Sequence, residues 1–193
     1  MGNPPALPEL RTERLLLRSF RAEDAPAVQR LAGAFEIADT TLLIPHPYPD
    51  GLAEKWISGH ATALANGESL VFAVTEAATG QLCGSIGLMI SKEHAKAEMG
   101  YWIGVPFWGK GYATEAGRAL LEYGFGQWNL NRIFALHFCR NPASGRVLAK
   151  LGLRHEGRLR QHIKKGDGFE DVECWGLLRL DWTEGLKAGK LDS

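Results

Sequence analysis

The segment at residues 105–116 (VPFWGKGYATEA) carries the clearest chemical signal in the sequence. Gly109 and Gly111 have no Cβ atom, so the backbone there can turn sharply and approach a ligand closely. A helix is expected to begin near Thr114, and its first N–H groups have no partner within the helix. These free amides and the helix dipole together favour an anion. The loop therefore predicts a phosphate site.

Two common phosphate motifs do not fit this loop. A Walker loop needs Ser or Thr after Gly-Lys, whereas Gly111 follows Lys110 here. A dinucleotide fingerprint needs a third glycine where Thr114 stands. On glycine content alone, a plain strand-to-helix turn stays open as the alternative.

The elements that must position this loop follow from the apolar spacing along the chain. Runs typical of strands lie at 14–20, 69–76, 81–90, 97–103, 131–138, 154–163 and 169–178, and helical patterns lie at 21–32, 52–64, 114–128 and 141–151. Three prolines exclude a helix at 44–51. This order predicts an α/β (α+β) fold with one mixed sheet of about seven strands and helices on both faces.

Length and charge limit the kinds of protein that this chain can be. It has 193 residues, which predicts a single domain. Lys and Arg together number 22, as do Asp and Glu, so the formal net charge is zero. Nucleic acids and anionic membranes select for a basic surface, so we expect neither as a partner.

Cysteine usage and the lack of a long apolar run predict a cytoplasmic protein without a metal. Cys83, Cys139 and Cys174 are scattered and form no Cys-x-x-Cys pair, which is typical of free thiols in a reducing compartment. The N-terminal residues lack the apolar segment of a signal peptide, and no run approaches the length of a membrane span.

Three further segments combine with the glycine loop into a familiar pattern. The order is 12–25 (TERLLLRSFRAEDA), 97–103 (AEMGYWI), 108–116 (WGKGYATEA) and 141–157 (NPASGRVLAKLGLRHEG). This combination resembles the Gcn5-related N-acetyltransferases (GNAT superfamily), and within them the RimJ/RimL-like branch of ribosomal-protein N-terminal acetyltransferases. The resemblance implies an N-acetyltransferase domain at 10–182, with a flexible leader at 1–9 and a C-terminal tail at 183–193.

The resemblance also implies acetyl-CoA as cosubstrate, held where the fourth and fifth predicted strands splay apart. The pantetheine arm would fit into this cleft like an added strand. The family's pyrophosphate pattern, Arg/Gln-x-x-Gly-x-Gly/Ala, falls on residues 108–113, and Trp108 departs from it. The implied cofactor-binding residues are Tyr101, Trp102, Ile103, Gly109, Lys110, Gly111, Tyr112, Ala113, Thr114, Asn141 and Ser144.

Direct acetyl transfer in a ternary complex needs a base for the attacking amine and an acid for the departing thiolate. The resemblance implies Glu98, on the strand at 97–103, as the base. It implies Ser144 as the acid, because Ser144 completes an Asn-x-x-Ser pattern that starts at Asn141. A buried Glu98 would work better as a base, since burial raises the pKa of a carboxyl group. Three acidic residues on the last predicted strand compete for this role: Glu170, Asp171 and Glu173.

The acceptor stays open at this stage, because a fold does not determine its substrate. It is a primary amine, either a protein N-terminal α-amine or a small molecule such as an antibiotic or a polyamine. The loop at 44–51, the helix after it and the hairpin at 163–171 are expected to shape its pocket. A noncatalytic acyl-CoA-binding module is the competing interpretation, and both a monomer and a homodimer fit the sequence.

Overall fold

The computed structural model describes residues 7–187. Its strands are β1 (Leu10–Arg11), β2 (Leu15–Ser19), β3 (Ser69–Glu76), β4 (Leu82–Ser91), β5 (Lys96–Ile103), β6 (Arg132–Phe138), β7 (Arg154–Lys165) and β8 (Gly168–Leu178). Its α-helices are α1 (Ala25–Ala32), α2 (Phe35–Thr40), α3 (Leu52–Ala65), α4 (Tyr112–Gln127), α5 (Pro142–Lys150) and α6 (Arg179–Lys187), and short 3₁₀ turns lie at Ala22–Asp24, Lys92–His94 and Val105–Phe107.

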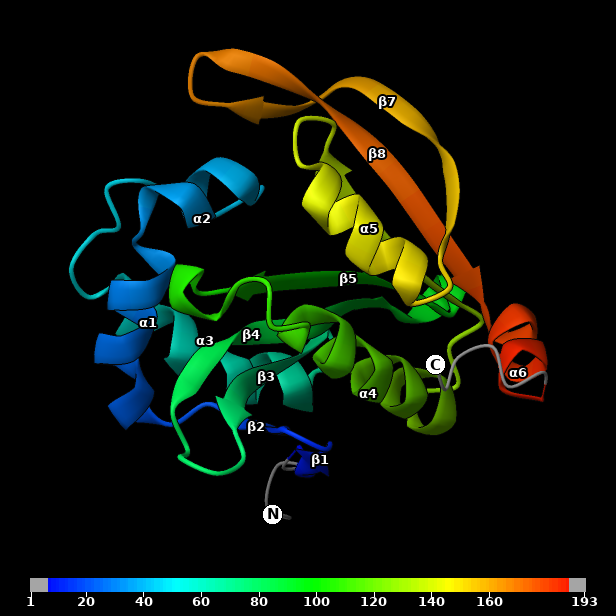
Figure 1. Cartoon of the computed structure of the whole chain (residues 1–193), viewed down its shortest axis with the longest axis horizontal. Helices are drawn as coiled ribbons and strands as arrows, with labels where there is room; N and C mark the ends of the chain where they lie inside the picture. Colours follow the sequence, from blue (N-terminus) through cyan, green and yellow to red (C-terminus); the bar gives the residue numbers. More distant parts are fainter. Residues whose placement is uncertain (1–6, 188–193) are drawn as a thin grey trace.

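All eight strands form one open sheet, in the order β1-β2-β3-β4-β5-β6-β8-β7 (Figure 1). Neighbouring strands are antiparallel except β5 and β6, which are parallel and are connected through α4. Figure 1 shows α4 and α5 in front of the strands and α3 behind them. The predicted mixed sheet with helices on both faces is confirmed, and its eighth strand is the two-residue β1, which is too short to show alternation.

The pairing between β5 and β6 stops after three residues. Lys96, Ala97 and Glu98 pair with Arg132, Ile133 and Phe134, and no later residue of β5 has a partner on β6. β6 itself continues to Phe138 and pairs along its whole length with β8. The two strands therefore diverge beyond Glu98, which confirms the cleft predicted between the fourth and fifth strands of the sequence.

A core of apolar side chains between the sheet and its helices holds this divergence in place. Phe72 of β3, Ile133 of β6 and Leu120 of α4 are completely buried. β3 reads SLVFAVTE, and its nearly continuous burial is typical of a central strand. The cleft therefore opens within a well-packed sheet, between β5 and β6.

Several boundaries differ from the sequence-based expectation. α4 begins at Tyr112 rather than near Thr114, because Gly111 takes the left-handed conformation (φ 80°) and serves as the N-cap. Helix α2 was not expected, since six residues are too few for a clear periodic pattern. α6 crosses the predicted start of the tail at residue 183, and Trp182 anchors it by stacking on Phe125 with ring centroids 6.1 Å apart. The remainder of the predicted leader and tail, residues 1–6 and 188–193, lies outside the described residues.

Candidate functional site

The glycine loop lies between the end of β5 and the start of α4, as expected for an anion site. Gly109 and Gly111 both adopt left-handed backbone conformations, with φ of 76° and 80°. A Cβ atom built at Gly109 would meet no heavy atom within 4 Å, so the backbone there is open to a ligand. Ala113 and Thr114 lie in the first turn of α4, where backbone amides have no helical partner.

Two cations flank this loop. The Arg14 guanidinium, from the segment before β2, donates to the carbonyl of Lys110 at 2.9 Å and to the Glu115 carboxylate at 2.7 Å. The Lys110 ammonium lies 5.1 Å from the centroid of the Phe107 ring. No role was predicted for Arg14 from the sequence, because it stands 96 positions before Lys110. It does belong to the quoted segment 12–25. It stabilises the loop and adds positive charge beside it.

The side chains of three other predicted cofactor-binding residues near the loop make contacts within the protein. Trp102 and Ile103 are 8% and 7% exposed and belong to the core. The Tyr112 hydroxyl donates to the Glu76 carboxylate at 2.9 Å. Only the backbone of these three residues is therefore free to meet a cofactor.

Tyr101 and Ser144 meet across the cleft. The Tyr101 hydroxyl, from β5, lies 2.7 Å from the Ser144 hydroxyl, which stands in the first turn of α5. Burial raises the pKa of Tyr101 to about 12. Both hydroxyls are therefore protonated at neutral pH, and the pair can donate hydrogen bonds within the cleft.

Asn141 connects two elements at the mouth of the cleft. Its side-chain oxygen accepts from the Ser144 amide at 3.3 Å and caps α5, and its side-chain nitrogen donates to the carbonyl of Thr40 at 3.3 Å. Asn141 is thus the N-cap residue of α5. Its second contact attaches the end of α2 to the start of α5.

Glu98 lies on the opposite face of β5 from Tyr101, at the last pair before the strands diverge. It forms one row with Met89 of β4 and Phe134 of β6, because these residues are its direct partners in the sheet. All three line a hollow of about 280 Å³. Burial raises the pKa of Glu98, and the opposing effect of His162 is smaller.

The three competing acidic residues are engaged elsewhere. Glu170 pairs with Arg140 at 3.0 Å, and the Asp171 carboxylate accepts from the backbone amide of Gln161 at 2.8 Å. Glu173 accepts from its neighbours His155 and Arg158, both at 2.7 Å, and these contacts hold its pKa at about 2. A carboxylate so strongly stabilised in its charged form is a poor proton acceptor. Glu98 alone combines a raised pKa with a place at the divergence of the strands.

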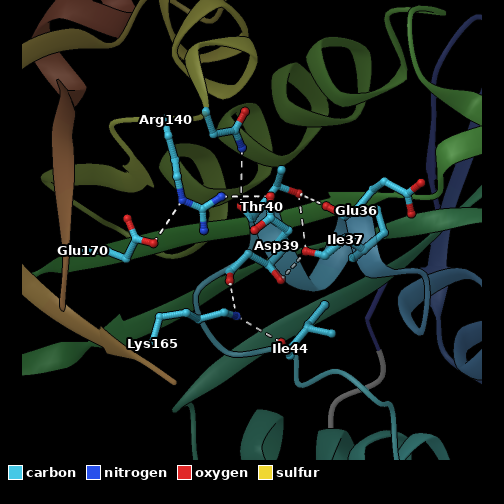
Figure 2. Close-up of polar contacts among 10 residues, drawn as sticks. Glu36, Ile37, Asp39, Thr40, Ile44, Arg140, Lys165 and Glu170 are labelled. Atoms are coloured by element: carbon cyan, nitrogen blue, oxygen red, sulfur yellow. Dashed lines mark hydrogen bonds and ion pairs between the residues drawn. The ribbon is translucent and has the colours of Figure 1, made fainter. Parts of the chain in front are cut away.

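The segments predicted to shape the acceptor pocket are connected by a polar cluster (Figure 2). We call residues 35–49, which comprise α2 and the loop after it, the α2 strap. Arg140 stands between Asp39, at 2.9 Å, and Glu170, at 3.0 Å. Lys165, at the end of β7, donates to the carbonyls of Thr41 at 2.8 Å and Ile44 at 3.2 Å. These contacts join the strap to the β7–β8 hairpin.

The remaining candidate groups have structural partners. His137 accepts from the Trp175 indole at 3.0 Å, and its other ring nitrogen lies 2.8 Å from a backbone carbonyl. Cys139 donates to Glu173, and burial raises the pKa of its thiol. Within residues 7–187, no cluster of three or more His, Cys, Asp or Glu side chains is suited to hold a metal ion. None of the described helices has the length and apolar character needed to cross a membrane.

The sequence profile of the Acetyltransferase (GNAT) domain matches residues 14–154, well over half of the chain. Together with a sheet that diverges beside a glycine-rich helix start, this match defines the class: the chain belongs to the GNAT family of acetyltransferases. Its relatives and structural neighbours are N-acetyltransferases, so this chain is an enzyme of the same kind.

Individual relatives match the chain over different lengths. An uncharacterised N-acetyltransferase of Bacillus licheniformis, p20, is 34% identical over 176 residues, which make up 90% of this chain and 98% of the relative. The ribosomal protein uS5-alanine N-acetyltransferase of Escherichia coli is 33% identical over 87 residues, 45% of each chain. The crystal structure of a GNAT acetyltransferase from Bacillus anthracis superposes with a TM-score of 0.80 at 26% identity, over 89% of this chain and 99% of that one.

Proposed function

We propose that this enzyme transfers the acetyl group of acetyl-CoA directly to a primary amine in a ternary complex. One observation carries the proposal: at the point where β5 and β6 part, Glu98 stands on one face of the sheet and the Tyr101–Ser144 pair on the other. A base and an acid thus flank one opening. This is the arrangement that an amine attacking a thioester requires.

The pyrophosphate of acetyl-CoA would bind the amides of residues 109–114, with Lys110 and Arg14 as flanking cations. The pantetheine arm would lie along the unpaired part of β5, beside Tyr101, and reach Asn141 and Ser144. This assignment uses the backbone of Trp102, Ile103 and Tyr112 and leaves their side chains in the core.

The reaction exchanges one bond for another. The amine nitrogen forms a bond to the thioester carbon, and the carbon–sulfur bond breaks. Glu98 accepts the proton that the nitrogen loses, and Ser144 supplies a proton to the departing thiolate. Tyr101 orients the Ser144 hydroxyl through their 2.7 Å hydrogen bond. The products are an N-acetylated amine and free CoA.

A protein N-terminal α-amine is the acceptor that amine basicity favours. An α-amine has a pKa near 7.7–8.0, about 2.5 units below that of a lysine, so it loses its proton more easily. The name of the Escherichia coli relative, a ribosomal-protein alanine acetyltransferase, points the same way. A small-molecule amine is the second candidate, and we expect the enzyme to act in the cytoplasm as a monomer or homodimer.

Calorimetric titration with acetyl-CoA tests the cofactor site. Gly111→Asp would put a side chain and a negative charge where the pyrophosphate is proposed, and Gly51→Asp is a matched control. Both glycines are exposed, left-handed N-caps of helices, with φ of 80° and 77°. Micromolar binding that is lost in Gly111→Asp but kept in Gly51→Asp supports the proposal. No binding by the folded wild type would overturn it.

A second assay separates an enzyme from a noncatalytic acyl-CoA-binding module. The wild type is incubated with acetyl-CoA and with peptides that carry a free α-amine, or with spermidine, and the release of CoA is measured. Acetylation of peptides in preference to spermidine supports the acceptor class. Binding of acetyl-CoA without acetylation of any amine would instead favour the noncatalytic module.

A further inference from the structure

One glycine leaves the sheet bare next to Glu98. On the face of the sheet that carries Glu98, the following row contains Gly87 of β4 and Gly100 of β5, which are direct partners. Gly100 is exposed, and a Cβ atom built there would meet no heavy atom within 4 Å, whereas one built at Gly87 would lie 3.3 Å from the Val71 side chain. The row beyond, Ser85 and Trp102, is buried again. The open strip is therefore confined to Gly100.

This strip lies between the proposed base and the opening of the cleft. Glu98 belongs to the last row in which β5 and β6 pair, so Gly100 is the first position on its face beyond the divergence. Residues two apart on a strand stand roughly 7 Å from each other on one face. A side chain at position 100 would therefore project between the Glu98 carboxylate and the gap that opens next to it.

We propose that Gly100 keeps open the passage by which the acceptor amine reaches the acetyl group, and that the width of this passage selects acceptors by branching at the amine-bearing carbon. The inference rests on the proposed function, since it takes the gap as the place of the acetyl group. Gly100 makes no bond to the acceptor. It determines specificity because it has no side chain that would narrow the passage.

Apolar side chains flank Glu98 within its row, and Glu68, Ser91 and Lys96 line the same hollow farther out. Met89 and Phe134 stand on either side of Glu98 in its row, and Met89 is 49% exposed. An amine that approaches Glu98 thus passes between apolar side chains, with only backbone beneath it at Gly100. A pocket with such walls discriminates by size, at roughly 10-fold to 200-fold per added methylene.

A graded series at position 100 tests this inference. Gly100→Ala, Gly100→Val and Gly100→Leu are assayed for kcat/KM with tetrapeptides that begin with Gly, Ala or Val, and for acetyl-CoA affinity by calorimetry. In Gly100→Ala, we expect the peptide that begins with Val to lose roughly 10-fold more activity than the one that begins with Gly. Gly100→Leu should reduce acetylation of all three peptides about 100-fold, with acetyl-CoA affinity unchanged.

Folding and nonspecific effects are controlled separately. Replacing a strand glycine should not lower the melting temperature, since glycine is an unfavourable residue inside a strand. Gly126→Leu, at an exposed α4 glycine that also faces open space, is the matched control and should keep wild-type kinetics.

The possible outcomes distinguish failure of this inference from failure of the proposed function. Equal losses for all three peptides in Gly100→Ala, wild-type activity in Gly100→Leu, or a parallel loss of acetyl-CoA affinity would each overturn the inference while leaving the proposed function intact. Failure of the wild type to acetylate any peptide or spermidine would overturn the proposed function, and the inference with it.

Discussion

At the scale of single residues, the two faces of β5 separate the proposed chemical roles. Glu98 lines the hollow on one face of the sheet, and Tyr101 points to the face covered by α5. Side chains on a strand alternate, so residues three apart must lie on opposite faces. One short strand thereby presents a base and a buried hydroxyl pair to the same gap.

Glu98→Gln tests the base. We expect kcat/KM to fall by roughly 10²–10⁴-fold, the usual contribution of general base catalysis. Burial raises the pKa of Glu98 above the ordinary value for Glu, which is near 4.3. As the pH decreases, the wild-type rate should therefore begin to fall at a pH above this ordinary value. The rate of the variant should not show this decrease. Measured pH–rate profiles of the wild type and the variant test this prediction. Unchanged rates in the variant would show that Glu98 is not the base.

Glu98→Gln should lower activity but raise the stability of the folded protein. A raised pKa in the folded state means that folding favours the protonated carboxyl group, so this contribution is present at low pH and is lost as pH rises through the pKa of the folded state. Glu98→Gln should therefore raise the melting temperature at neutral pH and change it little in acid. Lower stability at neutral pH would contradict this account.

The Tyr101–Ser144 pair predicts non-additive kinetics. Ser144→Ala should lower kcat by removing the proposed acid, and Tyr101→Phe should lower it less by releasing the Ser144 hydroxyl. If Tyr101 acts through Ser144, the double variant should be no slower than Ser144→Ala alone. A double-mutant cycle on kcat measures this coupling, and simple multiplication of the two losses would assign Tyr101 an independent role.

At the scale of elements, the α2 strap depends on partners outside itself. A helix of six residues is not stable in isolation. Asn141, Arg140 and Lys165 hold it from the β6–α5 connection and the end of β7. The strap and the β7–β8 hairpin are therefore joined by these contacts. Since both are expected to shape the acceptor pocket, we predict that acceptor binding depends on residues that do not touch the acceptor.

Lys165→Met tests this dependence while retaining the apolar stem of the side chain. Two hydrogen bonds from an ammonium to the carbonyls of Thr41 and Ile44 are lost, and bonds of this charged kind contribute about 1.5–3 kcal/mol each. We expect faster hydrogen exchange in residues 35–49 and a higher KM for the acceptor, with the acetyl-CoA affinity unchanged.

Arg154→Gln is the control for Lys165→Met. It breaks an ion pair between Arg154 and Asp181 at 3.1 Å, which joins β7 to α6 and does not involve the strap. Exposed pairs of this kind contribute little, about 0–1 kcal/mol. Equal exchange rates in the strap for Lys165→Met and the wild type would show that the Lys165 contacts do not hold it.

At the scale of the whole molecule, two parts of the sheet share a narrow junction. Strands β1 to β5 and strands β6 to β8 meet at only three paired positions, so the helices and the core must hold them together. α4 contributes Leu120, and β3 contributes Phe72, both completely buried. The geometry of the cleft is therefore a property of the core as much as of the cleft residues.

Phe72→Ala tests the contribution of the core. Removing a fully buried phenylalanine should cost about 3–5 kcal/mol of unfolding free energy, through lost transfer energy and the cavity left behind. Phe169→Ala is the matched control, because Phe169 is 61% exposed on β8. Urea denaturation measures both, and similar losses for the two variants would contradict the assigned core.

The sequence by itself determined most of the fold and the cofactor loop, because both depend on local patterns. Apolar runs between turn residues located β2 to β8, and Gly109 and Gly111 marked the anion site, since backbone freedom at a glycine is a property of the residue. Family resemblance added Glu98 and Ser144 as candidates. It could not rank Glu98 against Glu170, Asp171 and Glu173, because a carboxyl group's pKa depends on neighbours that are distant along the chain.

Only the tertiary structure decided which of these groups face the gap. It engaged Glu173 with His155 and Arg158, placed Arg14 beside Lys110, and brought Lys165 to the α2 strap across more than 120 positions of sequence. It also left open space where a side chain at position 100 would lie, which no local pattern reveals. Contacts between distant segments follow from packing of the whole chain, and the segments expected to shape the acceptor pocket are joined by such contacts.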